Sequence, residues 1–134
     1  MAILLKKTTL HTDSFGFTPI TQAVQAFVTQ SGIKEGICVI FSPHTTAGIT
    51  INENADPDVK TDLSYAMNCI FPKLPGYRHL EGNSDAHVKS TVTGASETVI
   101  IHDGRLLLGR WQALYFCEYD GPRVRTFYTK ILEG

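Results

Sequence analysis

The chain has 134 residues, of which 43% are hydrophobic and 19% charged, and its formal net charge is -1. These values are typical of one globular domain, so we expect residues 1–134 to form a single unit. The near-neutral charge argues against a nucleic-acid-binding surface, and no apolar run approaches the roughly 20 residues of a membrane helix. The apolar residues of segment 1–12 precede its lysines, the reverse of a secretory signal, so we predict a cytoplasmic protein.

The cysteines are also consistent with a cytoplasmic protein. Cys38, Cys69 and Cys117 are widely spaced, and no CxxC pair occurs. We expect them to be small buried residues in a reducing environment rather than disulfide partners or ligands of a cysteine zinc site.

The first half of the chain predicts alternating strands and helices. Residues 3–12 read as a strand rich in β-branched side chains. A helix follows, with Thr18 as its N-cap, Pro19 at its first position and Gly32 at its end. Its apolar residues recur at helical spacing, which indicates one packed face: Ile20, Val24, Phe27 and Val28.

Two apolar strands, 35–43 and 47–53, come next and are separated by a break containing Pro43 and His44. A second helix is predicted from Asp56, its N-cap, to the stop at Pro72. Residues 72–85 read as a loop. Residues 84–94 read as a short helix capped by Ser84 or Asp85 and closed by Gly94.

The C-terminal third predicts an antiparallel meander. Strand patterns cover 97–102, 105–109, 110–119 and 123–132, and Asp-Gly pairs mark two of the turns. The predicted fold is therefore α+β, with about six mostly antiparallel strands in a β-sandwich or barrel-like core and two or three helices. The apolar strands outnumber the helices available to cover them, so we expect some strand faces to contact other subunits.

Three of the five histidines stand in loops or at a helix start. His44 lies at the break between two strands, His79 lies in the polar loop, and His87 lies in the first turn of the short helix. If the loop folds back over the break, three imidazoles could bind a divalent cation, zinc above all, with a fourth position open. Their spacing matches no standard zinc signature, and the alternative is three loop histidines with ordinary hydrogen bonds.

Two carboxylates are candidates for catalytic roles. Glu53 falls in register with Ile49 and Ile51, so it is either a solvated strand end or a functional acid. Asp62, on the predicted second helix, could orient a ligating imidazole.

Other polar residues suggest an anion site. Arg123 and Arg125 alternate along a strand, so both could grip a phosphate or carboxylate, although a solvated strand face is the alternative. Thr45 and Thr46 could add hydroxyl groups, unless they are ordinary strand-end threonines. The same C-terminal block contains three further candidates for substrate binding: Trp111, Gln112 and Glu118.

Three segments, "HTTAGITINENADPDVKTDL", "YRHLEGNSDAHVKSTVTG" and "DGRLLLGRWQALYFCEYDGPRVR", resemble the YjbQ-like family in order and spacing. Members of that family are often labelled secondary thiamine-phosphate synthase enzymes. The resemblance spans about residues 5–132 and implies a β-rich α+β fold, a homotrimer, and a histidine pocket near a subunit interface. It includes His44, Glu53, His79, His87 and the block from Gly104 to Arg125, whereas His11 and His102 match no family position.

Together these features predict a metal-dependent enzyme acting on a small phosphorylated metabolite. His44, His79 and His87 would bind the metal, Glu53 would move protons, and the arginines would steady the anion. The reaction would be a thiamine-phosphate synthase-like transfer or a phosphate-ester hydrolysis. The alternative is a non-catalytic trimeric module that binds a small ligand in the same histidine pocket.

Overall fold

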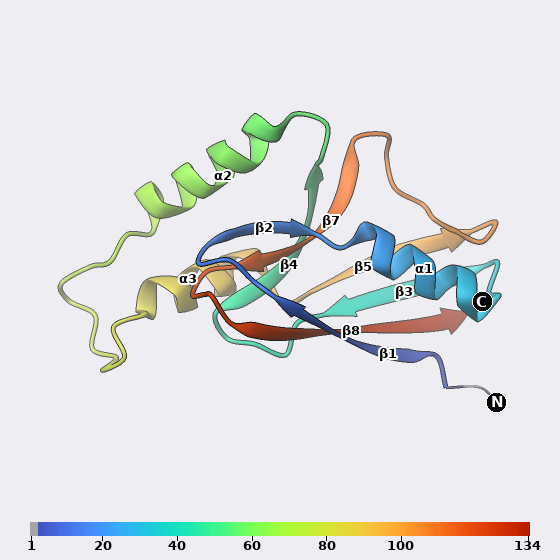
Figure 1. The fold of residues 1–134 in the computed structure, drawn as a ribbon, viewed down its shortest axis with the longest axis horizontal. Coiled ribbons are helices and arrows are strands. Elements are labelled where there is room, and N and C mark those ends of the chain that lie inside the picture. The colour runs from blue at the N-terminus through green and yellow to red at the C-terminus, as the bar shows by residue number, and fades with distance from the viewer. Residues whose placement is uncertain (1–2) are drawn as a thin grey trace.

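The computed structural model describes residues 3–134, which form eight strands and three helices (Figure 1). Their bounds in chain order are β1 Leu5–His11, β2 Gly16–Pro19, α1 Thr21–Ser31, β3 Gly36–Phe41, β4 Ala47–Glu53, α2 Pro57–Ile70, α3 Ser84–Thr93, β5 Ser96–His102, β6 Arg105–Leu106, β7 Gln112–Glu118 and β8 Val124–Glu133.

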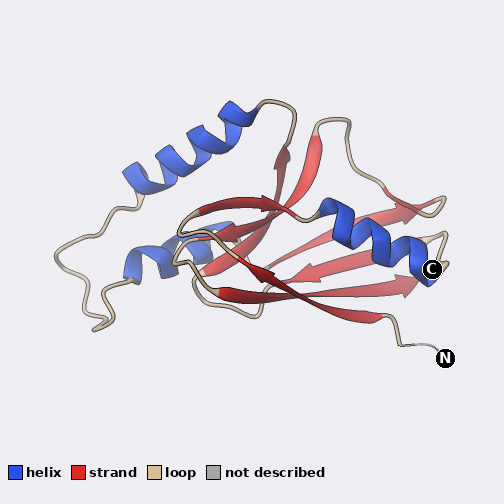
Figure 2. Cartoon of the chain, in the orientation of Figure 1, coloured by secondary structure: helices blue, strands red, loops and turns tan. Residues whose placement is uncertain are grey.

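The strands form two antiparallel sheets. The larger sheet has the order β1-β8-β3-β5-β6, and the smaller has the order β2-β7-β4. Helix α1 lies toward the chain termini, whereas α2, α3 and the loop that joins them lie at the opposite end (Figure 2). The predicted α+β fold with a mostly antiparallel, curled core is confirmed, with two more strands than expected. The predicted C-terminal meander is wrong beyond the β5–β6 pair, because β7 lies in the smaller sheet, between β2 and β4, and β8 pairs with β1 and β3.

The start of the first helix was predicted wrongly. Residues 16–19 form the short edge strand β2, paired with β7, and α1 begins at Thr21 without a side-chain cap. Proline is tolerated on an edge strand because its missing N–H can face away from the partner strand, so Pro19 fits β2 as well as a helix start. The hydroxyl of Thr21 instead accepts a hydrogen bond from the backbone N–H of Leu114 at 2.9 Å.

The other helices follow the sequence more closely. Asp56 caps α2 by accepting a hydrogen bond from the Asp58 N–H, and Pro57 occupies the first helical position. Helix α3 ends at Gly94 as expected, but Asn83 rather than Ser84 or Asp85 stands at its N-cap position. No helix among residues 3–134 combines the length and apolar character that a membrane span requires.

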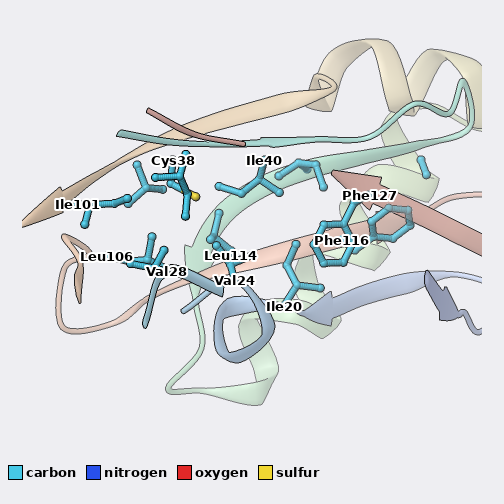
Figure 3. Packing of buried hydrophobic residues seen from close by; sticks show 14 residues of the cluster. Ile20, Val24, Val28, Cys38, Ile40, Ile101, Leu106, Leu114, Phe116 and Phe127 are labelled. Atoms are coloured by element: carbon cyan, nitrogen blue, oxygen red, sulfur yellow. The ribbon is translucent and has the colours of Figure 1, made fainter. Parts of the chain in front are cut away.

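The main hydrophobic core fills the space between α1 and the inner faces of the two sheets (Figure 3). Strand β7 contributes to it through Leu114 and Phe116, while Tyr115 and Cys117 on its other face join a smaller cluster with Ala86 of α3. Burial on both faces explains why this strand reads as one continuous apolar run. Cys38 and Cys117 are buried as predicted, but Cys69 is exposed on α2.

Helix α3 docks tightly on the start of β4. A Cβ atom on Gly48 would lie 2.7 Å from the Gly94 carbonyl oxygen and 2.9 Å from a methyl carbon of Thr93. The Ser90 hydroxyl also donates to the Ala47 carbonyl oxygen at 2.7 Å. The absence of a side chain at position 48 therefore allows the close approach that places α3 beside the strand.

We predict that Gly48→Ala destabilises the fold by about 1–3 kcal/mol, the usual cost of overpacking a tight contact. The matched control is Gly76→Ala, where an added Cβ meets nothing within 4 Å. Urea unfolding of both variants checks this expectation. Equal stability of the two variants would contradict the close packing at Gly48.

Candidate functional site

A cavity of about 390 Å³ lies where β3 and β7 end and β4 and β8 begin, beside α3. It gathers seven of the site residues predicted from the sequence: His44, Thr45, Thr46, His79, His87, Arg123 and Arg125. Pro43, Glu81 and Asn83 complete its lining. Segments separated by as many as 80 residues therefore meet around one polar pocket.

Two of the histidines form a pair on one wall of the cavity. The ring centroids of His79 and His87 are 5.3 Å apart, with their planes nearly perpendicular at 88°. His79 comes from the loop after α2, and His87 comes from the first turn of α3. The loop does fold back toward the break at 43–46, as the sequence suggested.

The third histidine is tied to the backbone of β8. The His44 Nε2 atom lies 3.0 Å from both the backbone nitrogen and the backbone oxygen of Thr126. Phe41 and Tyr128 are the last paired residues of β3 and β8. Just beyond this point, the His44 ring bonds to the β8 backbone in place of a β3 residue. Because Nε2 is occupied, Nδ1 is the ring nitrogen that remains for a ligand.

The environment of His44 favours the neutral imidazole. Partial burial lowers the pKa of His44, and the nearby positive charge of Arg125 lowers it further. Neutral imidazole is the form that ligates metal ions. His44 is therefore held in a ligand-competent protonation state at neutral pH.

Arg125 is held by a buried carboxylate beneath the cavity. Its Nε donates to Glu118 Oε1 at 2.7 Å, and its Nη2 donates to Glu118 Oε2 at 2.5 Å. The Thr12 hydroxyl and the Asp120 backbone N–H also donate hydrogen bonds to the Glu118 carboxylate. Burial alone would raise the pKa of Glu118, but these hydrogen bonds outweigh it and lower the pKa.

Glu118 therefore has a different position from the one predicted. It is only 2% exposed and does not line the cavity, so it orients Arg125 instead of contacting a substrate. Arg125 Nη2 also donates to the Thr46 hydroxyl at 2.8 Å, which fixes that side chain too.

Arg123 is held by Asp120 in a similar way. Its Nε donates to the backbone oxygen of Asp120 at 2.7 Å, and its Nη2 donates to Asp120 Oδ2 at 2.9 Å. Among residues 3–134, Nη1 of both Arg123 and Arg125 forms no hydrogen bond. Each guanidinium group thus keeps one nitrogen for a ligand of the cavity that it lines.

The structure places the other predicted residues elsewhere. Strands β4 and β7 pair so that Ala47 faces Glu118 at the cavity end, whereas Glu53 faces Gln112 at the far end. The six residue-to-residue steps from Ala47 to Glu53 separate the two ends by about 20 Å. The sequence argument missed this separation because β4 runs away from the cavity and β7 runs back to it, so the end of β4 and the start of β7 lie together at the far end.

These distal residues have local partners. The Glu53 carboxylate accepts from the Asp56 N–H at 3.3 Å, and the Gln112 amide oxygen accepts from the Gly109 N–H at 2.7 Å. Trp111 is 55% exposed, with the Arg110 guanidinium 4.8 Å from its ring. Asp62 is exposed on α2 and contacts no histidine among residues 3–134. The prediction that these four join the histidines in one site is corrected.

Three residues of the site were missed by the sequence argument. Glu81 is the one carboxylate among the described residues that line the cavity, and its Oε1 lies 3.8 Å from His79 Nε2. Asn83 and Asp120 are joined by a 2.8 Å hydrogen bond across 37 residues. Polar residues alternate at positions 79, 81 and 83, and this pattern could have identified Glu81 and Asn83. No local pattern in the sequence pointed to Asp120.

The three predicted metal ligands line one cavity but do not converge on one point. Among residues 3–134, no three histidine, cysteine or acidic side chains are arranged closely enough to hold a metal ion. The His79–His87 pair and Glu81 stand near one another, whereas the His44 ring is drawn toward β8 by Thr126. The donor set of neutral imidazole and carboxylate is nevertheless the chemistry that suits a divalent cation.

Fold and cavity together define a small antiparallel α+β protein with a histidine- and arginine-lined pocket. The chain belongs to the family described as UPF0047 protein YjbQ-like, which matches residues 6–134.

Relatives from distant organisms share most of the chain. It is 55% identical over 113 residues to UPF0047 protein MJ1081 of Methanocaldococcus jannaschii, covering 84% of this chain and 82% of that protein. It is 54% identical over 114 residues to UPF0047 protein YugU of Bacillus subtilis, covering 84% and 86%. A crystal structure of a YjbQ/UPF0047 family protein from Clostridium acetobutylicum superimposes with a TM-score of 0.92 at 48% identity, covering 95% and 99%.

We predict that two histidines titrate on opposite sides of the ordinary value of 6.5. Burial and Arg125 place the pKa of His44 below it, whereas the hydrogen bond that His102 Nδ1 donates to the Glu35 carboxylate places the pKa of His102 above it. Protonation of His44 is thus harder in the folded state, so its contribution to stability falls as pH drops through 6.5. NMR titration of the ring resonances measures both, with His102 as the internal control. A His44 midpoint above 6.5 would refute the assigned environment.

Proposed function

We propose that the cavity binds the phosphate group of a small metabolite together with a divalent metal ion, with zinc as the first candidate. We further propose that the protein is a metal-dependent enzyme acting on that phosphorylated compound. The observation that supports this most directly is the convergence of three imidazoles, two guanidinium groups and one carboxylate on a single cavity.

The arginines supply the anion-binding groups. Within residues 3–134, Nη1 of Arg123 and of Arg125 has no hydrogen-bond partner, and the Thr46 hydroxyl accepts from Arg125, so the Thr46 proton is available for donation. Guanidinium nitrogens and hydroxyls with fixed orientation suit phosphate oxygens. Because their carboxylate partners already hold both arginines, little side-chain freedom would be lost on binding.

The charge balance supports a requirement for a cation. The two guanidinium groups are offset by Glu118 and Asp120, and Glu81 adds a further negative charge on the lining. A phosphate dianion would therefore meet little net positive charge in the protein alone. A divalent cation would supply the missing charge, which explains why imidazoles and arginines share the cavity.

The chain's own residues divide the chemistry as follows. His79, His87 and His44, the last through Nδ1, would hold the cation, which would supply Lewis-acid polarisation of a phosphoryl oxygen or water. Arg123 and Arg125 would orient the phosphate. Glu81, in place of Glu53, would accept the proton of the attacking hydroxyl or water, because Glu81 faces the cavity. The reaction class is phosphate-ester hydrolysis or a thiamine-phosphate synthase-like displacement of pyrophosphate.

The second candidate function is a non-catalytic module that binds a small anionic ligand. One observation favours it: the Glu81 side chain is 68% exposed, so the protein does little to desolvate the proposed base. Glu81→Gln separates the two functions. If the protein is an enzyme, this variant should bind phosphate as wild type does and lose turnover. If the protein is a non-catalytic module, the variant should bind phosphate as wild type does, and neither protein should show turnover.

We predict that the purified, untagged protein equilibrated with zinc retains about one zinc ion per chain after dialysis. His87→Ala should lose that ion because it removes half of the paired imidazoles, whereas His11→Ala, outside the cavity, should retain it. Elemental analysis by mass spectrometry gives the stoichiometry. If wild-type protein retains no zinc, manganese or cobalt, the metal-dependent proposal fails.

We also propose that the protein forms a homotrimer in the reducing cytoplasm, where buried thiols such as Cys38 remain reduced. The outer face of the larger sheet supports self-association. Ile37 lies between Ile100 and Leu132 on the neighbouring strands, and these three side chains are 40%, 55% and 47% exposed. Phe41, 43% exposed, continues the same face. Contiguous exposed apolar residues of this kind mark interfaces.

We predict that sedimentation equilibrium gives a mass three times the 14.8 kDa of one chain. Ile100→Glu should reduce that mass, because it places a charge within the apolar face. Ile70→Glu, at an exposed position on α2, is the matched control and should leave the mass unchanged. A wild-type mass of one chain at micromolar concentration would rule out the trimer.

A further inference from the structure

We infer that Asp120 is a positioning residue of the candidate site, through which the turn after β7 anchors the histidine-bearing loop and Arg123 in the same geometry. Its significance for ligand binding rests on the proposed function, but its effect on the loop does not.

Asp120 contacts both sides of the cavity with one carboxylate oxygen. Its Oδ2 accepts from Asn83 Nδ2 at 2.8 Å and from Arg123 Nη2 at 2.9 Å. Its backbone N–H donates to Glu118 Oε2 at 3.0 Å, and this carboxylate also holds Arg125. Asp120 therefore links the loop, both arginines and the buried ion pair.

The bond to Asn83 is the loop's main attachment. Residues 71–83 lie at the end of the molecule farthest from the termini (Figure 1), and most of their side chains are exposed. Among residues 3–134, the Asn83–Asp120 bond is the one side-chain hydrogen bond that joins this loop to a residue outside it. The backbone hydrogen bonds of the loop are internal or lead to the helices that it connects.

Asn83 transmits this anchoring to the functional side chains. Its carbonyl oxygen accepts from the N–H groups of Ala86 and His87, so Asn83 fixes the first turn of α3 that carries His87. Its Nδ2 also lies 3.4 Å from Glu81 Oε2. Loss of the Asp120 contact would thus release Glu81 and His79 and loosen the start of α3.

Asp120 is well suited to a permanent anchor because it stays ionised. Burial acts to raise its pKa, but the hydrogen bonds from Asn83 and Arg123 outweigh burial, and the pKa lies below its ordinary value. Both hydrogen bonds are therefore to a charged acceptor, which makes them stronger than neutral ones.

The test uses Asp120→Ala in the full chain, with Asp62→Asn as the control for removing an exposed carboxylate. Amide hydrogen exchange of residues 76–83 should accelerate roughly 10- to 100-fold in Asp120→Ala, as expected for the loss of a hydrogen bond to a charged group. Exchange in β3 and β7 should change much less. The ring-current shift between His79 and His87 should also diminish, because it depends on their edge-to-face contact.

Two further variants keep the test decisive if Asp120→Ala folds poorly. Asp120→Asn retains an acceptor for Asn83 and should have an intermediate effect, while Asn83→Ala cuts the same link from the loop side. Asp120→Ala combined with Asn83→Ala should accelerate exchange no more than the stronger single change. Unchanged exchange of residues 76–83 in folded Asp120→Ala or Asn83→Ala overturns the inference.

Titration with inorganic phosphate in the presence of manganese adds the functional readout. Asp120→Ala should weaken binding about 10-fold relative to wild type, the ratio expected for loss of one such contact. Glu53→Gln, at the far end of β4, should bind as wild type does. If wild type fails to bind phosphate while exchange still rises in Asp120→Ala, the proposed function fails and the positioning role stands.

Discussion

The buried ion pair between Arg125 and Glu118 is the interaction on which the site depends. It joins the end of β7 to the start of β8, and Thr12 and Thr46 bond to the same two side chains. Removing one partner of such a pair typically costs about 3–5 kcal/mol, because the other charge is left buried without compensation. The pair thus belongs to the core energetically, even though one of its members lines a functional cavity.

This arrangement shapes what the cavity can bind. Arg125 is presented by Glu118, and Arg123 is presented by Asp120, so each cation is rigid but largely neutralised. The neighbouring imidazoles come from three different segments and are held less firmly, with His44 bonded to the backbone of β8 and the His79–His87 pair depending on a loop. The proposed joint binding of a phosphate and a cation would therefore combine rigidly held arginines with more adjustable histidines.

The candidate site was predictable where function and local sequence coincide. His44, His79 and His87 stood out because they lie at a strand break, in a polar loop and at a helix start, and Arg123 and Arg125 stood out because they alternate. Glu53 was included because it shares a strand face with Ile49 and Ile51, and Gln112 because it belongs to the C-terminal block, but the β4–β7 register places both at the far end. Asp120 was missed because its importance comes from a hydrogen bond to a residue 37 positions earlier, which no local pattern reveals.

By itself the sequence determined the α+β class, the antiparallel β5–β6 pair, the Asp56 cap of α2 and the end of α3 at Gly94. These features follow from hydrophobic periodicity, turn residues and capping, which act over a few positions. Only the tertiary structure decided that residues 16–19 pair with β7, that Glu118 faces inward, and that Glu81 and not Glu53 faces the cavity. Those outcomes depend on strand register and on long-range hydrogen bonds, which are set when distant segments pack together.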